Sequence, residues 1–155
     1  MDNVYLPSEW FSYLDDGHID VWFKRDSLFT TKVQNEFLGA IEDSGYTYDL
    51  VKRRDAELKI KEVDVVDPLI PGVQGRFIPK GDTAVIKVNL RTQFTRGWKR
   101  YNRFISHHEM GHALGLAHQF DTSITNTVMN YPTFDEVYSG RAANRLTTRD
   151  LFNTR

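Results

Sequence analysis

Three histidines and one glutamate within residues 108–118 have the types and the spacing of a catalytic metal site. His108 and His112 are four residues apart, so on a helix they share one face, with about 5–6 Å between their Cβ atoms. One divalent ion can therefore take an imidazole nitrogen from each ring. Glu109 lies about 100° round a helix of ~3.6 residues per turn, where its carboxylate can reach a water on the ion rather than the ion itself.

A third histidine can join this pair only if the helix ends before it. Gly115 can adopt a positive φ without steric cost, so the helix can stop there and the chain can turn back. This turn would bring His118 to the ion. Three neutral imidazole nitrogens and one water form an open tetrahedral zinc site, which is the catalytic and not the structural kind. The sequence therefore predicts one catalytic zinc ion, Zn2+, with His108, His112 and His118 as ligands.

The string from His108 to His118 matches H-E-x-x-H-x-x-G-x-x-H at every fixed position. A bare H-E-x-x-H recurs by chance in unrelated proteins, but the added glycine and third histidine make an accidental match improbable. The competing interpretation is a buried helix whose histidines are satisfied by hydrogen bonds. The complete pattern resembles the metzincin clan of zinc endopeptidases.

A methionine and a tyrosine extend this resemblance. Met129 in Val-Met-Asn-Tyr is similar to the methionine of the metzincin Met-turn, a tight turn beneath the metal site. Tyr131 follows two positions later, where astacins and serralysins carry a tyrosine that contacts the zinc or the reacting oxyanion. The resemblance implies that Tyr131 is a second catalytic residue. The alternative is a tyrosine packed in the wall of the specificity pocket.

Composition indicates one ordinary globular domain, residues 1–155. The chain is 40% apolar and 26% charged, with a formal charge of -1, so we expect neither nucleic acid nor membrane as a partner. It has no cysteine, which excludes disulfides, thiolate ligands and a cysteine nucleophile. No signal peptide is visible. The default expectation is a cytoplasmic monomer, with export by another route as the alternative.

Apolar periodicity predicts five strands and two long helices. The predicted strands span residues 18–24, 46–53, 58–66, 73–78 and 83–90. The first long helix is predicted from about residue 27 or 30 to residue 43, and the second over residues 99–116. A short terminal helix is predicted over residues 146–152. The alternation slips near Glu62, which predicts a bulge.

This layout is similar to that of matrixin catalytic domains. The resemblance implies an α+β fold with a twisted mixed five-stranded sheet, an antiparallel edge strand, two long helices and a short C-terminal helix. The loop before the predicted edge strand lacks the histidines that bind a structural zinc in matrixins. Gln119 is not the usual residue at this position in matrixins, astacins, serralysins or adamalysins, so the family within the clan stays unassigned.

The site and the resemblance together imply a zinc-dependent endopeptidase with Glu109 as general base. We expect a protein or peptide substrate to lie extended along the edge strand 73–78 by main-chain pairing. The alternatives are a zinc-containing binding or structural module of the same fold and a hydrolase of non-peptide amides. Six basic residues and no acid lie in residues 87–103; given the near-neutral total charge, a solvated face is preferred to an anionic partner.

Overall fold

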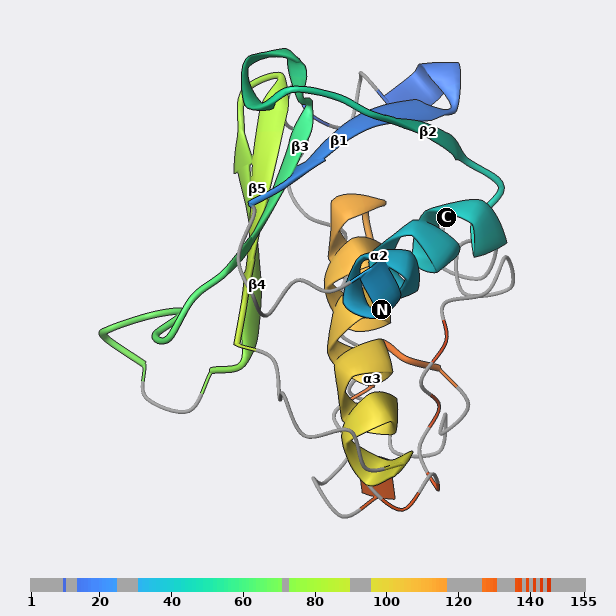
Figure 1. Ribbon diagram of the computed structural model, residues 1–155, viewed down its shortest axis with the longest axis vertical. Coiled ribbons are helices and arrows are strands. Elements are labelled where there is room, and N and C mark those ends of the chain that lie inside the picture. The colour runs from blue at the N-terminus through green and yellow to red at the C-terminus, as the bar shows by residue number, and fades with distance from the viewer. Residues whose placement is uncertain are drawn as a thin grey trace.

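The computed structural model describes residues 10, 14–24, 31–70, 73–89, 96–116 and 127–130, and individual residues between 136 and 145. Five strands form one sheet in the order β2-β1-β3-β5-β4. Helices α2 and α3 lie together on one side of it (Figure 1). The strands are β1 His18–Phe23, β2 Thr47–Leu50, β3 Leu58–Glu62, β4 Gly75–Lys80 and β5 Thr83–Val88. The helices are α2 Thr31–Asp43 and α3 Arg96–Ala113, with short 3-10 turns η1 Leu14–Asp16 and η2 Arg53–Asp55.

The sheet is mixed, as the sequence analysis predicted. Strand β1 pairs in parallel with β2 and β3, and β3 pairs in parallel with β5. Strand β4 alone among these strands runs antiparallel, paired with β5 on one side, and it is the last strand in the order. The predicted α+β fold with an antiparallel edge strand is confirmed, while the predicted terminal helix 146–152 lies outside the described residues.

The predicted bounds of the edge strand, 73–78, are wrong by two residues at each end. The strand begins at Gly75 and continues through Pro79 to Lys80. Proline is tolerated at an edge because its missing N–H can face away from the ladder. Pro79 stands opposite Ala84, whose own N–H donates to Glu57 on the far side. The proline nitrogen therefore faces the side of β4 that pairs with no strand among the described residues, called its open side below.

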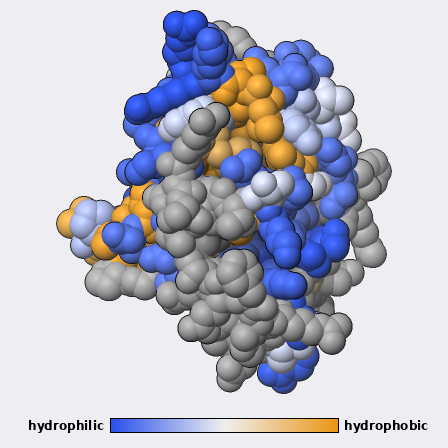
Figure 2. All heavy atoms as spheres, viewed as in Figure 1, coloured by the Kyte–Doolittle hydropathy of each residue, from blue (hydrophilic) through white to orange (hydrophobic). Residues whose placement is uncertain are grey.

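Strand β3 is shorter than predicted. Its five residues pair one to one with β5, from Leu58 with Ala84 to Glu62 with Val88, so the bulge predicted at Glu62 is absent from this ladder. Beyond it, three exposed apolar side chains lie in the loop that leads to β4, seen in orange at the left of the molecule (Figure 2). They are Val65, Leu69 and Ile70, with 64%, 89% and 55% exposure.

Alternating burial along the strands builds the core. Ile19, Val21 and Phe23 of β1 are buried and point toward the helices, with the intervening side chains only partly covered. Phe23 meets Phe37 of α2 edge to face, with 5.9 Å between ring centroids. Full burial of one such side chain contributes ~1.5–3 kcal/mol. Helix α2 ends as predicted at Asp43, and Gly45 just beyond it has a φ of 83°.

Helix α3 ends at Ala113 rather than at the predicted residue 116. Gly115 has a φ of 96°, and its N–H donates to the carbonyl of His112 while the N–H of Leu116 donates to that of Gly111. This pair of bonds is a Schellman motif with Gly115 as the left-handed residue. The indole of Trp10 donates to the carbonyl of Ala113 over 2.8 Å and so satisfies a further acceptor at the helix end.

A charged pair joins the two long helices. Arg103 of α3 donates from Nε and from one terminal nitrogen to the two carboxylate oxygens of Glu36 on α2, over 2.9 Å and 3.2 Å. Such a bidentate pair fixes the relative rotation of the helices as well as their distance. Within the described residues, no helix is long and apolar enough to cross a membrane.

Candidate metal centre

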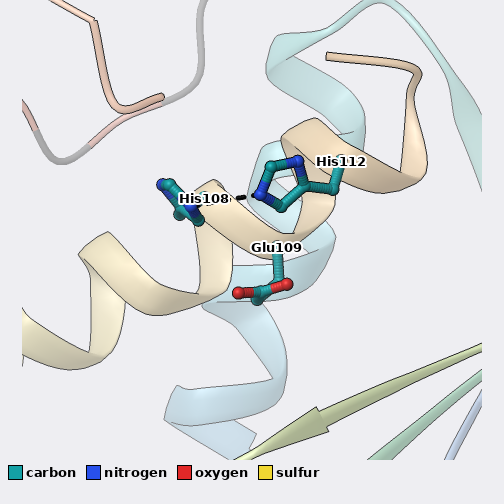
Figure 3. A group of neighbouring side chains, drawn as sticks. All are labelled: His108, Glu109 and His112. Atoms are coloured by element: carbon teal, nitrogen blue, oxygen red, sulfur yellow. Dashed lines mark hydrogen bonds between the residues drawn. The ribbon is translucent and has the colours of Figure 1, made fainter. Parts of the chain in front are cut away.

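Two histidine rings meet on successive turns of helix α3 (Figure 3). The Nε2 atoms of His108 and His112 are 3.2 Å apart, and the rings are nearly perpendicular, at 87°. Both residues are buried, with 6% and 3% exposure. The i, i+4 spacing thus brings two imidazole nitrogens to one point inside the protein.

A backbone carbonyl orients each ring. Nδ1 of His112 lies 2.7 Å from the carbonyl oxygen of Leu116, and Nδ1 of His108 lies 2.8 Å from that of Val128. A carbonyl oxygen can only accept, so each Nδ1 carries a proton, and a neutral ring then has its lone pair on Nε2. Two lone pairs facing each other repel unless a cation lies against both. The donor set therefore fits a metal ion bound through Nε2, with carbonyls holding the other ring nitrogen.

The carbonyl that orients His108 belongs to a tight turn at residues 127–130. The N–H of Asn130 donates to the carbonyl of Thr127 over 3.3 Å, and the N–H of Met129 donates to the Thr127 hydroxyl over 3.2 Å. Met129 itself is buried, with 2% exposure. The turn predicted around Met129 is therefore confirmed, and it contacts the histidine pair through the residue before the methionine.

Glu109 completes the group from the same helix (Figure 3). Its carboxylate and the two imidazoles offer ligand atoms that all lie within 4.8 Å of one another. The residue is 4% exposed, and its Oε2 has no hydrogen-bond partner among the described residues. Burial raises the pKa of this carboxyl to about 8. An acid kept in such surroundings is costly to the fold, which is typical of a group retained for its chemistry.

Comparison with known proteins agrees with this geometry. A family model described as Met-zincin matches residues 95–143, the stretch that contains α3, the histidines and the turn. The chain resembles the metzincins. A search of curated protein sequences found no match.

One solved structure shows a similar fold. One crystal structure of myroilysin superposes with a TM-score of 0.51 at 15% identity, covering 97% of this chain and 62% of that chain. A second structure of myroilysin gives a TM-score of 0.48 at 14% identity, covering 94% of this chain and 71% of that one. This chain therefore spans less than two thirds of the length of the first myroilysin chain. At this identity the likeness shows the fold.

The buried group on α3 contains three of the five site residues expected from the sequence. His108, Glu109 and His112 are brought together. His118 and Tyr131 lie outside the described residues, so their roles as third ligand and second catalytic residue stay predictions.

The sequence analysis missed the backbone groups of the site. The carbonyls of Leu116 and Val128 orient the rings, yet a carbonyl is present at every residue and leaves no mark in a sequence. The signal that could have indicated them was positional, since Leu116 follows the helix-ending glycine and Val128 precedes the methionine of the turn.

Two further histidines are accounted for by their surroundings. His107 is buried on the side of α3 that faces α2, with Nε2 3.9 Å from the Glu36 carboxylate, and burial lowers its pKa to about 4. His18 lies at the start of β1, where Nδ1 is 2.7 Å from the Thr47 hydroxyl and Nε2 is 3.2 Å and 3.1 Å from the carboxylates of Asp20 and Asp49. Both histidines thus have polar neighbours of their own, apart from the His108–His112 pair.

The basic residues of the stretch 87–103 whose side chains are described lie on β5 and on α3. Lys87 is on β5, Lys99 is exposed near the start of α3, and Arg103 is paired with Glu36 between the helices.

Proposed function

We propose that the protein is a zinc-dependent endopeptidase in which His108, His112 and His118 hold one Zn2+ and Glu109 is the general base. The observation that carries the proposal is the buried Glu109 carboxylate, with one oxygen lacking a partner among the described residues, beside two Nε2 atoms that face one point. A purely structural zinc does not need that carboxylate, so its presence favours an enzyme over a zinc-containing binding or structural module.

When bound, zinc would lower the pKa of a water to about 7 and polarise the scissile carbonyl. Glu109 accepts the proton of the attacking water and delivers it to the leaving amine. Its burial raises its affinity for a proton. The charge of a bound zinc ion beside it would favour the ionised form, which is the form that can accept the proton. Tyr131, by resemblance, donates a hydrogen bond to the developing oxyanion.

The open side of β4 is suited to an extended peptide. Gly75 stands opposite Val88, whose carbonyl accepts from Val63 on the far side, so this is a pair that shares no ladder bond. The N–H and C=O of Gly75 therefore face outward, and those of Phe77 do so by the alternation of the strand. Pro79 offers only its carbonyl there. We expect a substrate to pair with residues 75–77 and to gain no donor bond from residue 79.

Peptide-library digestion by wild type, Glu109→Gln and the exposed control Glu42→Gln tests the proposal. We expect the wild type and the control to cleave, and a chelator to stop them. Glu109→Gln should keep its zinc and lose ~10²–10⁴ in kcat, the usual contribution of general acid–base catalysis. Zinc-loaded Glu109→Gln with full activity would show that the base is misassigned. A zinc-loaded wild type that cleaves no peptide would favour the binding module.

A further inference from the structure

Gly75, the first residue of edge strand β4, lies directly against the side chain of Glu109. A Cβ atom at residue 75 would be 2.7 Å from Oε1, 2.9 Å from Cγ and 3.0 Å from Cδ of Glu109. Real Cβ atoms essentially never approach heavy atoms to less than 3.0 Å. The site thus has no room for even a methyl group between this strand and the carboxylate.

Space, and not backbone conformation, is what requires a glycine here. The described glycines with positive φ are Gly17, Gly45, Gly81 and Gly115. Gly75 is not among them, and it continues in regular register with Val88 of β5. Any residue could adopt this backbone, so the contact with Glu109 is the constraint that the structure places on residue 75.

The same residue faces the open edge of the sheet with its main-chain groups. Its N–H and C=O point away from β5, because the opposite residue, Val88, bonds to the far side. A side chain on its Cα, in contrast, would point toward the Glu109 carboxylate of helix α3. The backbone that is suited to pair with a peptide and the group that would act on that peptide are therefore in direct contact.

We propose that Gly75 is a positioning residue for the Glu109 carboxylate, an inference that rests on the proposed peptidase function. The three atoms nearest to a methyl group at residue 75 would all belong to the Glu109 side chain, and none belongs to backbone. Such a methyl group would be accommodated by displacing the carboxylate while the sheet and the helix stay in place. A displacement of about 1 Å in a catalytic group can cost 10²-fold in rate.

The first test compares Gly75→Ala with Gly39→Ala, a matched control in helix α2 whose added methyl would meet nothing within 4 Å. We expect Gly75→Ala to bind zinc within twofold of wild type, because the histidine ligands are not touched. Its kcat should fall at least tenfold while KM changes less than threefold. Gly39→Ala should keep both. A kcat of Gly75→Ala within twofold of wild type would overturn the proposal, and so would a loss confined to KM, which would assign residue 75 to substrate pairing alone.

The second test needs no activity, and so it separates this inference from the proposed function. Gly75→Ala is made in wild type and in Glu109→Ala, which removes the atoms that the new methyl would meet, and unfolding midpoints are measured in urea without metal. We expect Gly75→Ala to lower the midpoint in the wild-type background and to lower it by at most half as much in the Glu109→Ala background. Equal shifts in both backgrounds would overturn the contact, whether or not the wild type cleaves peptides.

Discussion

The buried carboxyl of Glu109 makes the stability of the metal-free protein depend on pH in a way that one substitution should remove. Burial raises the pKa of Glu109 from 4.5 to about 8. Between these two values the folded protein holds a proton that the unfolded chain has released, so stability falls as pH rises through this window and levels off above it. At 1.36 kcal/mol per pH unit, the rise from 4.5 to about 8 corresponds to a loss of up to about 5 kcal/mol.

Glu109→Gln keeps the shape of the side chain and cannot ionise. We expect the variant and the wild type to differ little at pH 4.5, and the variant to become progressively more stable than the wild type up to about pH 8. The assay is urea unfolding of both chelator-treated proteins at half-unit steps from pH 4.5 to 8.5. Taking the difference cancels the titration of groups that both proteins share, such as His107, whose lowered pKa costs stability in acid. A difference that stays constant across the range would refute the reasoning.

Two further predictions concern the end of helix α3. Gly115→Ala places a Cβ on a residue with a φ of 96°. We expect this variant to lose about 1–2 kcal/mol of stability, measured by urea unfolding, and to bind zinc more weakly, measured by competition with a chromogenic chelator. Gly39→Ala is the control. Unchanged zinc affinity would mean that the turn does not orient the histidines that bind zinc. Trp10→Phe removes the donor to the Ala113 carbonyl; we expect a loss of roughly 1–3 kcal/mol for the acceptor left buried, seen as a lower urea midpoint. A midpoint equal to that of the wild type would show that this bond does not stabilise the helix end.

The part of the site that the sequence could predict is the part that is local in the chain. His108, Glu109 and His112 lie within five residues on one helix, so helical geometry alone brings them together. The five strands and their mixed pairing were also predictable, because alternation marks strands such as 83–90 and the order of elements resembles a known layout.

The features that escaped prediction depend on partners distant in sequence. A proline at residue 79 predicts the end of the edge strand, yet the strand continues because the proline nitrogen faces the open side, which only the pairing of Ala84 with Glu57 reveals. In the sequence alone, Gly75 reads as an interruption of the strand. Its contact with Glu109 joins residues 34 positions apart in the sequence, and no periodicity in the sequence reports such a contact.

The spacing of the glycine in the motif has a physical reason in the backbone of Leu116. The N–H of Leu116 donates to the carbonyl of Gly111 and closes helix α3, while its carbonyl accepts from Nδ1 of His112. Both bonds require the chain to reverse between His112 and Leu116, and the left-handed conformation of Gly115 provides that reversal. The same turn therefore ends the helix and orients the ring of His112. A residue that straightened this turn would release the ring of His112 at the same time as it frayed the helix, even though it touched no ligand atom.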